Sequence, residues 1–205
     1  MSLPLNASRI LNPQLDRLLA DLRNCDLPSH EVRRITGNIA QILADEVAPF
    51  VPPAPTGPHG TQLGLIVVLR SGLAMSDAFM ERYRPDVIYH LGIFRDQTSL
   101  QPVEYYNKLP NNNTEVKRVI VLDPLIATGG TAGAVVQILR DWGVDHITFV
   151  SILASQAGLD NAAKIWPEGT RFVVSAVDPS LNERGYIVPG IGDIGDRLFG
   201  TGLSS

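Results

Sequence analysis

Residues 119–131 read VIVLDPLIATGGT, and this stretch decides the fold. Its first four residues are all apolar, which is typical of a strand buried on both faces of a parallel sheet. Asp123 follows directly and would lie at the carboxyl end of that strand, the edge where open α/β sheets bind ligands. Beyond Thr131 the apolar residues recur at helical spacing as far as Trp142, and Gly143 follows as a C-terminal cap. The loop between strand and helix is therefore predicted to bind a ligand.

The loop residues 127–131, ATGGT, suit an anion at a helix N-terminus. Gly129 and Gly130 allow the backbone to turn its N–H groups toward one point, and the hydroxyls of Thr128 and Thr131 add donors. A phosphate fits this arrangement. Asp123 would repel it unless a group lay between them. A ribose 5-phosphate supplies that group, because its hydroxyls donate to the carboxylate.

Other interpretations are weaker, two for this stretch and one for a glycine motif near the end of the chain. A P-loop needs a Lys-Ser/Thr pair after its glycines, and here Thr131 and Ala132 follow. Residues 190–195 read GIGDIG and match a dinucleotide fingerprint, but Pro189 precedes them and ten residues remain, so no βαβ unit fits. The third interpretation is an ordinary strand, turn and helix without a ligand.

The same stretch resembles the phosphoribosyl-diphosphate (PRPP) motif of the type I phosphoribosyltransferases, in which apolar residues, an acidic pair and A-T-G-G-T stand in this order. Pro124 replaces the second acid of many members, and Asp-Pro at this place is similar to the uracil phosphoribosyltransferases. The resemblance implies that nine consecutive residues bind PRPP: Asp123, Pro124, Leu125, Ile126, Ala127, Thr128, Gly129, Gly130 and Thr131.

Composition limits the functional classes. A chain of 205 residues with 44% hydrophobic residues fits one larger domain. The net charge of −4 argues against a surface that coats nucleic acid. Cys25 is the only cysteine, which suits a reducing compartment, and the four histidines have no metal-ligand spacing. No apolar run approaches the roughly 20 residues of a membrane span. The N-terminus lacks the pattern of a secretory signal, so we expect a cytoplasmic protein with no membrane partner.

The predicted architecture is α/β: a central, mainly parallel sheet with flanking helices, an N-terminal helical pair and a C-terminal segment. We expect a single domain, residues 1–205, with helices and a Pro-rich connector in 1–60, an α/β core in 61–177 and a tail in 178–205. The two helices cover residues 11–23 and about 29–47, with Ser29 as N-cap, and residues 49–60 are predicted to be extended. Their predicted inward positions are Leu11, Leu15, Leu18, Leu19, Leu22, Val32, Ile35, Ile39, Ile42, Leu43 and Val47, with Arg33 and Arg34 on a solvated face.

Two more strands of the predicted core end in arginine. Residues 63–69 lead into Arg70-Ser71-Gly72, a turn whose N–H groups and cation suit a diphosphate, and a helix follows over residues 73–83. Residues 87–94 lead into Arg95, and residues 95–110 show no period, so they read as a long functional loop. Both segments resemble parts of the uracil phosphoribosyltransferases, namely the diphosphate loop and a lid that closes over the site. The resemblance implies that Arg70 and Arg95 contact PRPP. Further strands are predicted over 147–153 and 172–177, with a helix over 156–165 between them.

The tail, residues 178–201, is rich in glycine and turns: DPSLNERGYIVPGIGDIGDRLFGT. It resembles the C-terminal signature of the uracil phosphoribosyltransferases, so that the resemblance covers residues 65–201. The edge of uracil presents acceptor, donor and acceptor, which closely spaced backbone groups can match without side chains. The resemblance implies that the main chain of Ile187, Gly192, Asp193 and Ile194 holds uracil and that Asp193 reaches PRPP through a Mg²⁺-bound water. Ile194 departs from the family's alanine and puts the size of the pocket in question.

The predicted function is transfer of the 5-phosphoribosyl group from PRPP to uracil, giving UMP and diphosphate. Asp193, Asp123 and Arg95 are the implied catalytic residues, and Mg²⁺ is the implied cofactor, held through PRPP and water. The sequence offers no dedicated general base. Two alternatives stay open: a phosphoribosyltransferase for another nucleobase, and a non-catalytic, regulatory or RNA-binding homologue. The β-hairpin arm of many members is replaced by residues 49–60, so a homo-oligomer is expected only from the resemblance.

Overall fold

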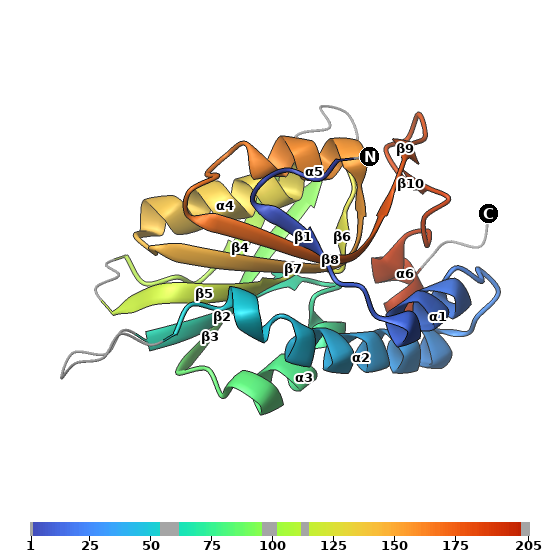
Figure 1. Ribbon diagram of the computed structural model, residues 1–205, viewed down its shortest axis with the longest axis horizontal. Coiled ribbons are helices and arrows are strands. Elements are labelled where there is room, and N and C mark those ends of the chain that lie inside the picture. Colours follow the sequence, from blue (N-terminus) through green and yellow to red (C-terminus); the bar gives the residue numbers. More distant parts are fainter. Residues whose placement is uncertain (1, 54–61, 96–101, 112–114, 202–205) are drawn as a thin grey trace.

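The computed structural model describes residues 2–53, 62–95, 102–111 and 115–201. Within them, the main sheet has the strand order β1-β8-β7-β5-β2-β3-β4, with β6 beside β7 (Figure 1). Its strands are β1 (Ala7–Arg9), β2 (Gln62–Leu69), β3 (Val87–Arg95), β4 (Pro102–Asn107), β5 (Val116–Leu122), β6 (Leu125–Ile126), β7 (His146–Ser155) and β8 (Thr170–Asp178). Every described pairing in this sheet is parallel except that of β3 with β4. The predicted mainly parallel sheet is confirmed.

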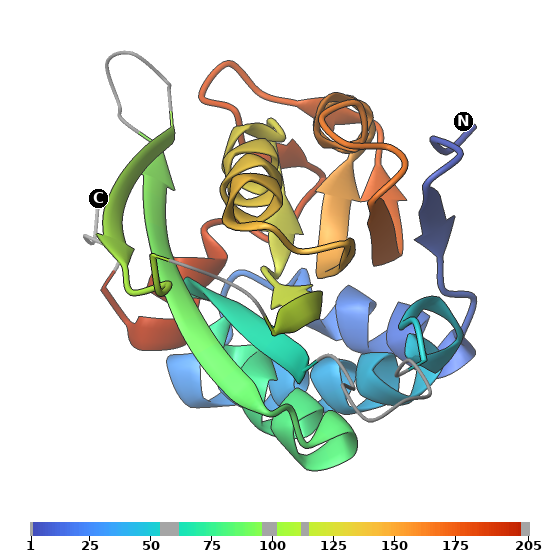
Figure 2. The ribbon, with the colours of Figure 1, turned by 90° about the vertical axis from the view of Figure 1, so that its left-hand side faces the viewer.

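Helices cover both faces of the sheet (Figure 1). On one face lie α1 (Pro13–Leu22), α2 (Ser29–Glu46) and α3 (Leu73–Tyr83), and on the other lie α4 (Gly130–Trp142) and α5 (Gln156–Ala163). Each face has its own cluster of buried apolar side chains. Because both faces of β5 are covered, its residues are apolar and buried from Val119 to Leu122, as the sequence predicts. In Figure 2, the green strands β3 and β4 run together along one side of the molecule.

The N-terminal helical pair is confirmed, with two differences at its ends. Asn12 caps α1 by accepting a hydrogen bond from the Gln14 amide, so the helix begins at Pro13. Leu11 precedes the cap and is 82% exposed, which makes its predicted place on the buried stripe wrong. Ser29 is the first residue of α2 and Pro28 occupies the cap position, with no side-chain capping bond.

Two further predictions need correction, and one strand was not predicted. The connector begins with a 3₁₀ turn, η1 (Ala48–Phe50), because Pro49 is compatible with the first turn of a helix; residues 54–60 of the connector lie outside the described residues. The long loop after Arg95 contains β4, which pairs with β3, while residues 96–101 also lie outside the described part. Residues 7–9 add the short edge strand β1, which no periodicity indicates.

The tail contains regular structure that its composition does not suggest. Strands β9 (Ser180–Leu181) and β10 (Ile187–Val188) form a small antiparallel hairpin, and α6 (Ile194–Phe199) follows. Asp193 caps α6 by accepting a hydrogen bond from the Asp196 amide over 3.1 Å. Figure 1 shows α6 beside the end of the sheet and close to α1.

Candidate active site

Asp123 lies directly after β5, at the carboxyl edge of the sheet, and is 6% exposed. Burial raises the pKa of its carboxyl from 3.8 to about 7, although hydrogen bonds from the Leu125 amide and the Ser71 hydroxyl act in the opposite direction. The Ser71 Oγ lies 3.5 Å from Asp123 Oδ1. Since β2 and β5 are parallel neighbours, the turn after β2 and the aspartate after β5 meet at one edge.

The predicted phosphate loop begins the next helix. Gly129 adopts a left-handed conformation, with φ of 85°, and stands at the N-cap of α4. A Cβ atom at this position would lie 2.4 Å from the carbonyl oxygen of Gly158 in α5, so only glycine fits the turn. The Gly130 amide is 3.4 Å from Thr128 Oγ1. Because α4 has 13 residues, its N-terminal amides and dipole favour an anion at this loop.

Pro124 takes a structural role at the place of the family's second acid. It is buried, and its carbonyl accepts hydrogen bonds from the amides of Ile152 and Leu153, both over 3.0 Å. Leu125 and Ile126 then pair with β7 as strand β6. The backbone between the aspartate and the phosphate loop is therefore fixed to the neighbouring strand.

Sequence reasoning missed the residues that support this loop from β7 and α5. The Ser151 hydroxyl donates to the Asp123 carbonyl, and the Ser155 hydroxyl donates to the Ala127 carbonyl, each over 2.5 Å. The Asn161 side chain donates to the Thr128 carbonyl over 3.2 Å. These partners meet only through the pairing of β5 and β6 with β7, so no local sequence signal identifies them.

Arg70 links the turn after β2 to the tail. Its Nη2 lies 3.3 Å from Asp196 Oδ1, and its Nη1 lies 3.4 Å from Thr201 Oγ1. The guanidinium also stands over the Phe199 ring, 5.6 Å from the centroid. A Cβ atom at Gly195 would lie 3.9 Å from Arg70 Nη2, so the tail backbone passes close to this cation. Arg70 is exposed, which is compatible with its predicted contact with a diphosphate.

The described end of the predicted lid segment lies next to the predicted phosphate loop. A Cβ atom at Gly130 would lie 3.9 Å from Pro102 Cδ, so the start of β4 lies next to the N-terminus of α4. Arg95 ends β3 in the backbone, and the position of its side chain lies outside the described part of the chain. Its predicted contact with PRPP therefore stays a prediction.

The predicted uracil segment combines a short strand with glycine turns. Ile187 pairs with Leu181 in the hairpin, and Gly192 has a φ of 70°. The Ile194 side chain is 3% exposed and belongs to the apolar cluster under α1 and α2. The larger side chain at this position is therefore accommodated by the core. Asp193 is exposed, and its Oδ1 is engaged by the capping bond of α6.

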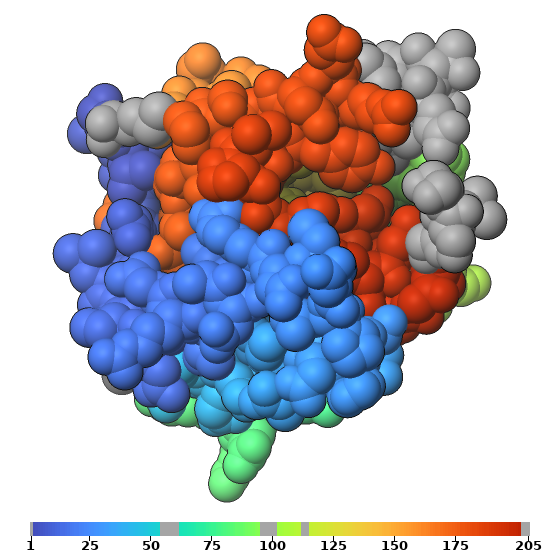
Figure 3. Space-filling view, turned by 90° about the vertical axis from the view of Figure 1, so that its right-hand side faces the viewer, coloured from blue at the N-terminus to red at the C-terminus, as the bar shows by residue number. Residues whose placement is uncertain are grey.

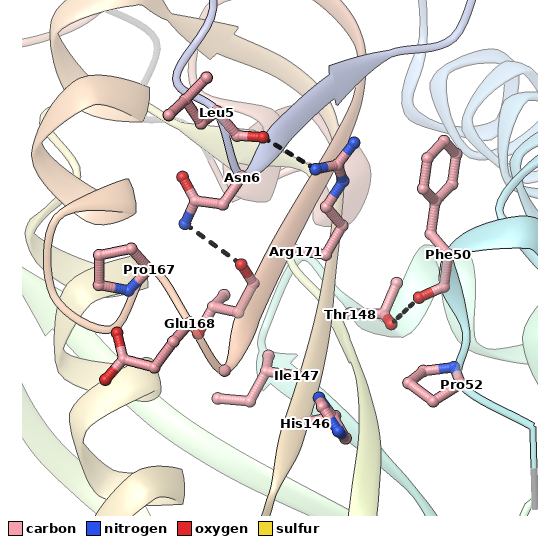
Figure 4. Close-up of a pocket in the computed structure, with 12 residues that line it drawn as sticks. Leu5, Asn6, Phe50, Pro52, His146, Ile147, Thr148, Pro167, Glu168 and Arg171 are labelled. Atoms are coloured by element: carbon pink, nitrogen blue, oxygen red, sulfur yellow. Dashed lines mark hydrogen bonds between the residues drawn. The ribbon is translucent and has the colours of Figure 1, made fainter.

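The carboxyl edge of the sheet is hollowed between the tail segments. Figure 3 shows this hollow between the orange hairpin segment and the red end of the chain, with olive-coloured residues from the middle of the chain at its floor. Two open cavities of about 520 and 650 Å³ lie elsewhere. The first is at the opposite edge, where Arg171, Thr148 and Asn6 bond to backbone carbonyls (Figure 4), and the second lies between the N-terminal segment and α5. Neither is lined by a predicted site residue.

Among the described residues, no three His, Cys, Asp or Glu side chains come together as a metal site. Within the same residues, no helix combines the length and the apolar character needed to cross a bilayer.

A family model described as uracil phosphoribosyltransferase matches residues 10–201. The putative uracil phosphoribosyltransferase urg2 of Schizosaccharomyces pombe is 44% identical over 191 residues, covering 93% of this chain and 88% of its own. The uracil phosphoribosyltransferase of Roseiflexus castenholzii is 39% identical over 202 residues, covering 93% and 96%. Among solved structures, the AQ2163 protein from Aquifex aeolicus superposes with a TM-score of 0.82 at 24% identity, covering 96% and 99%, and shows the fold alone.

Proposed function

Because the chain belongs to the uracil phosphoribosyltransferase family, we propose that it transfers the 5-phosphoribosyl group from PRPP to N1 of uracil, giving UMP and diphosphate. The observation that supports this most is that three segments meet at one edge of the sheet: the turn after β2, the segment after β5 and the tail. Ser71 of the turn after β2 reaches Asp123, and Arg70 of the same turn reaches Asp196 and Thr201 of the tail. Segments that meet in this way can contact the phosphate, the sugar and the base of one ligand.

We assign the sugar phosphate to the loop after β5. The backbone and hydroxyls of residues 128–131 would bind the 5-phosphate at the N-terminus of α4, and the Asp123 carboxylate would accept from the ribose hydroxyls. The supporting bonds from Ser151 and Ser155 favour this role, because they fix the loop before the ligand arrives. Pre-formed donors cost no reorganisation when the ligand binds.

We assign the departing diphosphate to Arg70 and Arg95. Positive charge builds on the ribose ring as diphosphate leaves C1, so stabilising the leaving anion lowers the barrier. The Arg70 guanidinium is exposed at the site and is bonded to a carboxylate, which like diphosphate is negatively charged. Closure of residues 95–110 over the site would exclude water from the reactive sugar.

We propose Mg²⁺ as the cofactor, held by PRPP and water. A bound Mg²⁺ would neutralise charge on the diphosphate and keeps several waters of its own. The Asp193 carboxylate is exposed and the Asp123 carboxylate lies at the same edge, so both suit hydrogen bonds from metal-bound water. The residues present therefore fit an ion that reaches the protein through water and substrate.

We assign uracil to the main chain of Ile187 and of Gly192, Asp193 and Ile194. A backbone N–H aimed at O4 would lose its partner if cytosine, with an amino group at that position, were bound. The names of the relatives give uracil as the base, which weighs against the alternatives of another nucleobase or a non-catalytic homologue.

We further propose one domain over residues 1–205, a homo-oligomer and a cytosolic location. The cytosolic location is in keeping with a single unpaired cysteine, Cys25.

The test is direct. Purified protein with labelled uracil, PRPP and Mg²⁺ should form labelled UMP, and unlabelled uracil should suppress the label far better than unlabelled cytosine, hypoxanthine or xanthine. An Asp193→Asn variant should lose most turnover while its thermal unfolding stays close to that of the wild type. Absence of UMP from the folded wild-type protein, or incorporation of a purine in its place, would overturn the proposal.

A further inference from the structure

An ion pair outside the proposed substrate contacts joins the first helix to the tail. Arg23 is the C-cap residue of α1, and Asp178 is the last residue of β8, 155 positions later. Arg23 Nη2 lies 2.8 Å from Asp178 Oδ1, and Arg23 Nη1 lies 2.8 Å from Asp178 Oδ2. The Asp178 side chain is 8% exposed and that of Arg23 is 27% exposed. This is the two-point pairing that arginine makes with carboxylate and lysine cannot reproduce.

Both members of the pair also hold the backbone of Gly190. The Gly190 amide donates to Asp178 Oδ2 over 2.9 Å, and Arg23 Nη1 donates to the Gly190 carbonyl over 2.7 Å. Gly190 has a φ of 63°, and a Cβ atom there would lie 2.0 Å from the Ile187 carbonyl oxygen. The turn between Ile187 and Gly192 is therefore fixed at its middle by one ion pair.

Arg197 connects the next tail residue, Ile191, to the end of α1. Its Nη1 donates to the carbonyls of Ile191 and Leu22 over 2.6 and 2.7 Å, and its Nη2 donates to the Asn24 carbonyl over 2.6 Å. Two consecutive tail residues, Gly190 and Ile191, are thus bonded to arginines that lie on or bond to the end of α1. The end of α1 therefore holds the segment that precedes Gly192 in place.

We propose that Arg23 and Asp178 are positioning residues for uracil; this inference rests on the proposed function and deepens it. When main-chain groups recognise the base, no side chain can change its rotamer to compensate. Any displacement of the backbone therefore changes the hydrogen bonds to uracil directly. Displacements of about 1 Å at such a site cost affinity and rate out of proportion to their size. The pair acts on the uracil half of the site, because the phosphate loop is held separately by Ser151, Ser155 and Asn161.

The experiment compares two conservative variants with a matched control. Arg23→Lys keeps the charge and loses the two-point geometry, and Asp178→Asn keeps one acceptor oxygen and loses the charge. Arg82→Lys is the control, because Arg82 also bonds an aspartate, Asp45, over 2.9 Å, but between the exposed sides of α3 and α2. Initial rates with uracil and PRPP varied in turn, and thermal unfolding, are measured for each protein.

We expect Arg23→Lys and Asp178→Asn to raise the KM for uracil by about tenfold and to leave the KM for PRPP within about twofold. Arg82→Lys should change neither constant. If both constants stay at wild-type values in the folded Arg23→Lys and Asp178→Asn proteins, the pair only stabilises the fold and the inference is overturned; an equal rise in both constants also overturns it. Should Arg23→Lys fail to fold, the nearly isosteric Asp178→Asn decides. A folded wild-type protein without uracil turnover would instead overturn the proposed function, and the inference with it.

Discussion

Arg70 and Asp196 form an ion pair across the candidate site, with Arg70 Nη2 3.3 Å from Asp196 Oδ1. The Thr201 hydroxyl donates to the same carboxylate oxygen over 2.6 Å. If Arg70 receives the diphosphate of PRPP, the ligand must draw the guanidinium away from a carboxylate that already bonds it. Asp196 would then oppose the binding of diphosphate and assist its release.

The first prediction concerns this competition. Asp196→Asn removes the charge and keeps an oxygen for Thr201, so diphosphate should inhibit the variant more strongly than the wild type. An exposed pair of this kind contributes up to about 1 kcal/mol, which corresponds to a change of up to about fivefold in the inhibition constant. Product inhibition by diphosphate measures it. Asp45→Asn, which breaks the exposed pair with Arg82, should leave the constant unchanged. Weaker inhibition of Asp196→Asn would contradict the idea of competition.

The second prediction follows from the pKa of Asp123, which burial raises to about 7. The ionised carboxylate accepts from ribose hydroxyls through both oxygens and more strongly than the protonated acid, which turns one oxygen into an O–H donor. The KM for PRPP should therefore rise as pH falls below 7, approaching tenfold per pH unit when one ionisation controls binding. The Asp123→Asn variant should bind PRPP weakly, and its KM for PRPP should not rise further as pH falls. Initial rates between pH 5.5 and 8.5 test this. If the KM for PRPP of Asp123→Asn rises at low pH as it does in the wild type, the pH dependence belongs to another group.

The same ionisation has a consequence for stability. Between pH 3.8 and about 7, the folded protein retains the Asp123 proton that the unfolded chain has lost. The free energy of unfolding contributed by this group therefore falls as pH rises through that window and is level above it. Urea unfolding at several pH values should show that the free energy of unfolding of Asp123→Asn increases relative to that of the wild type as pH rises through this window. A constant difference between the two proteins would contradict the raised pKa.

The third prediction separates two glycines by their surroundings. Gly129→Ala places a Cβ atom 2.4 Å from the Gly158 carbonyl oxygen at a φ of 85°, so it should destabilise the fold by about 2 kcal/mol or more and weaken PRPP binding. Gly37→Ala in α2 is the control, because nothing lies within 4 Å of the added atom. It should stabilise the helix by about 0.5–1 kcal/mol and leave turnover unchanged. Urea unfolding and PRPP titration of both variants give the comparison.

Local patterns account for most of the fold and for the phosphate loop. The uninterrupted apolar run before Asp123 indicates a buried strand, and the helical spacing after Thr131 indicates α4, since each depends on neighbours within a few residues. Strand β4 escaped prediction because its residues from Val103 to Asn107 are all exposed, so burial imposes no alternation on them. Strand β1 is only three residues long, which is too short for any period.

The supporting parts of the site could not be predicted for a different reason. Arg23 reads as an ordinary basic residue at a helix end, and its partner Asp178 lies at the end of the last long strand. Arg33 is exposed, as expected for a solvated face, and its Nη1 also donates to the Leu198 carbonyl of α6 over 2.5 Å, a contact that its sequence position does not indicate. Such pairs depend on how elements distant in the sequence pack together. The sequence therefore indicates the motif that is predicted to bind the ligand, but it does not indicate the residues that hold this motif in place.

The last prediction tests one of those holding residues. The Ser155 hydroxyl donates to the Ala127 carbonyl over 2.5 Å and accepts from the Gly158 amide over 2.8 Å, and the residue is fully buried. Ser155→Ala leaves both backbone groups without this partner, so we expect a loss of about 1–3 kcal/mol in the free energy of unfolding. Because Ala127 opens the phosphate loop, the KM for PRPP should rise as well.

Ser175→Ala provides the matched control for that change. Ser175 is also buried, and its hydroxyl donates to the Ile152 carbonyl between β8 and β7, and not to a residue of the phosphate loop. It should cost a similar free energy of unfolding and leave the KM for PRPP at the wild-type value. Urea unfolding and initial rates with PRPP varied measure both effects. If the two variants lose stability equally and neither changes the KM, Ser155 supports the fold without shaping the loop, and the loop is held by its other contacts.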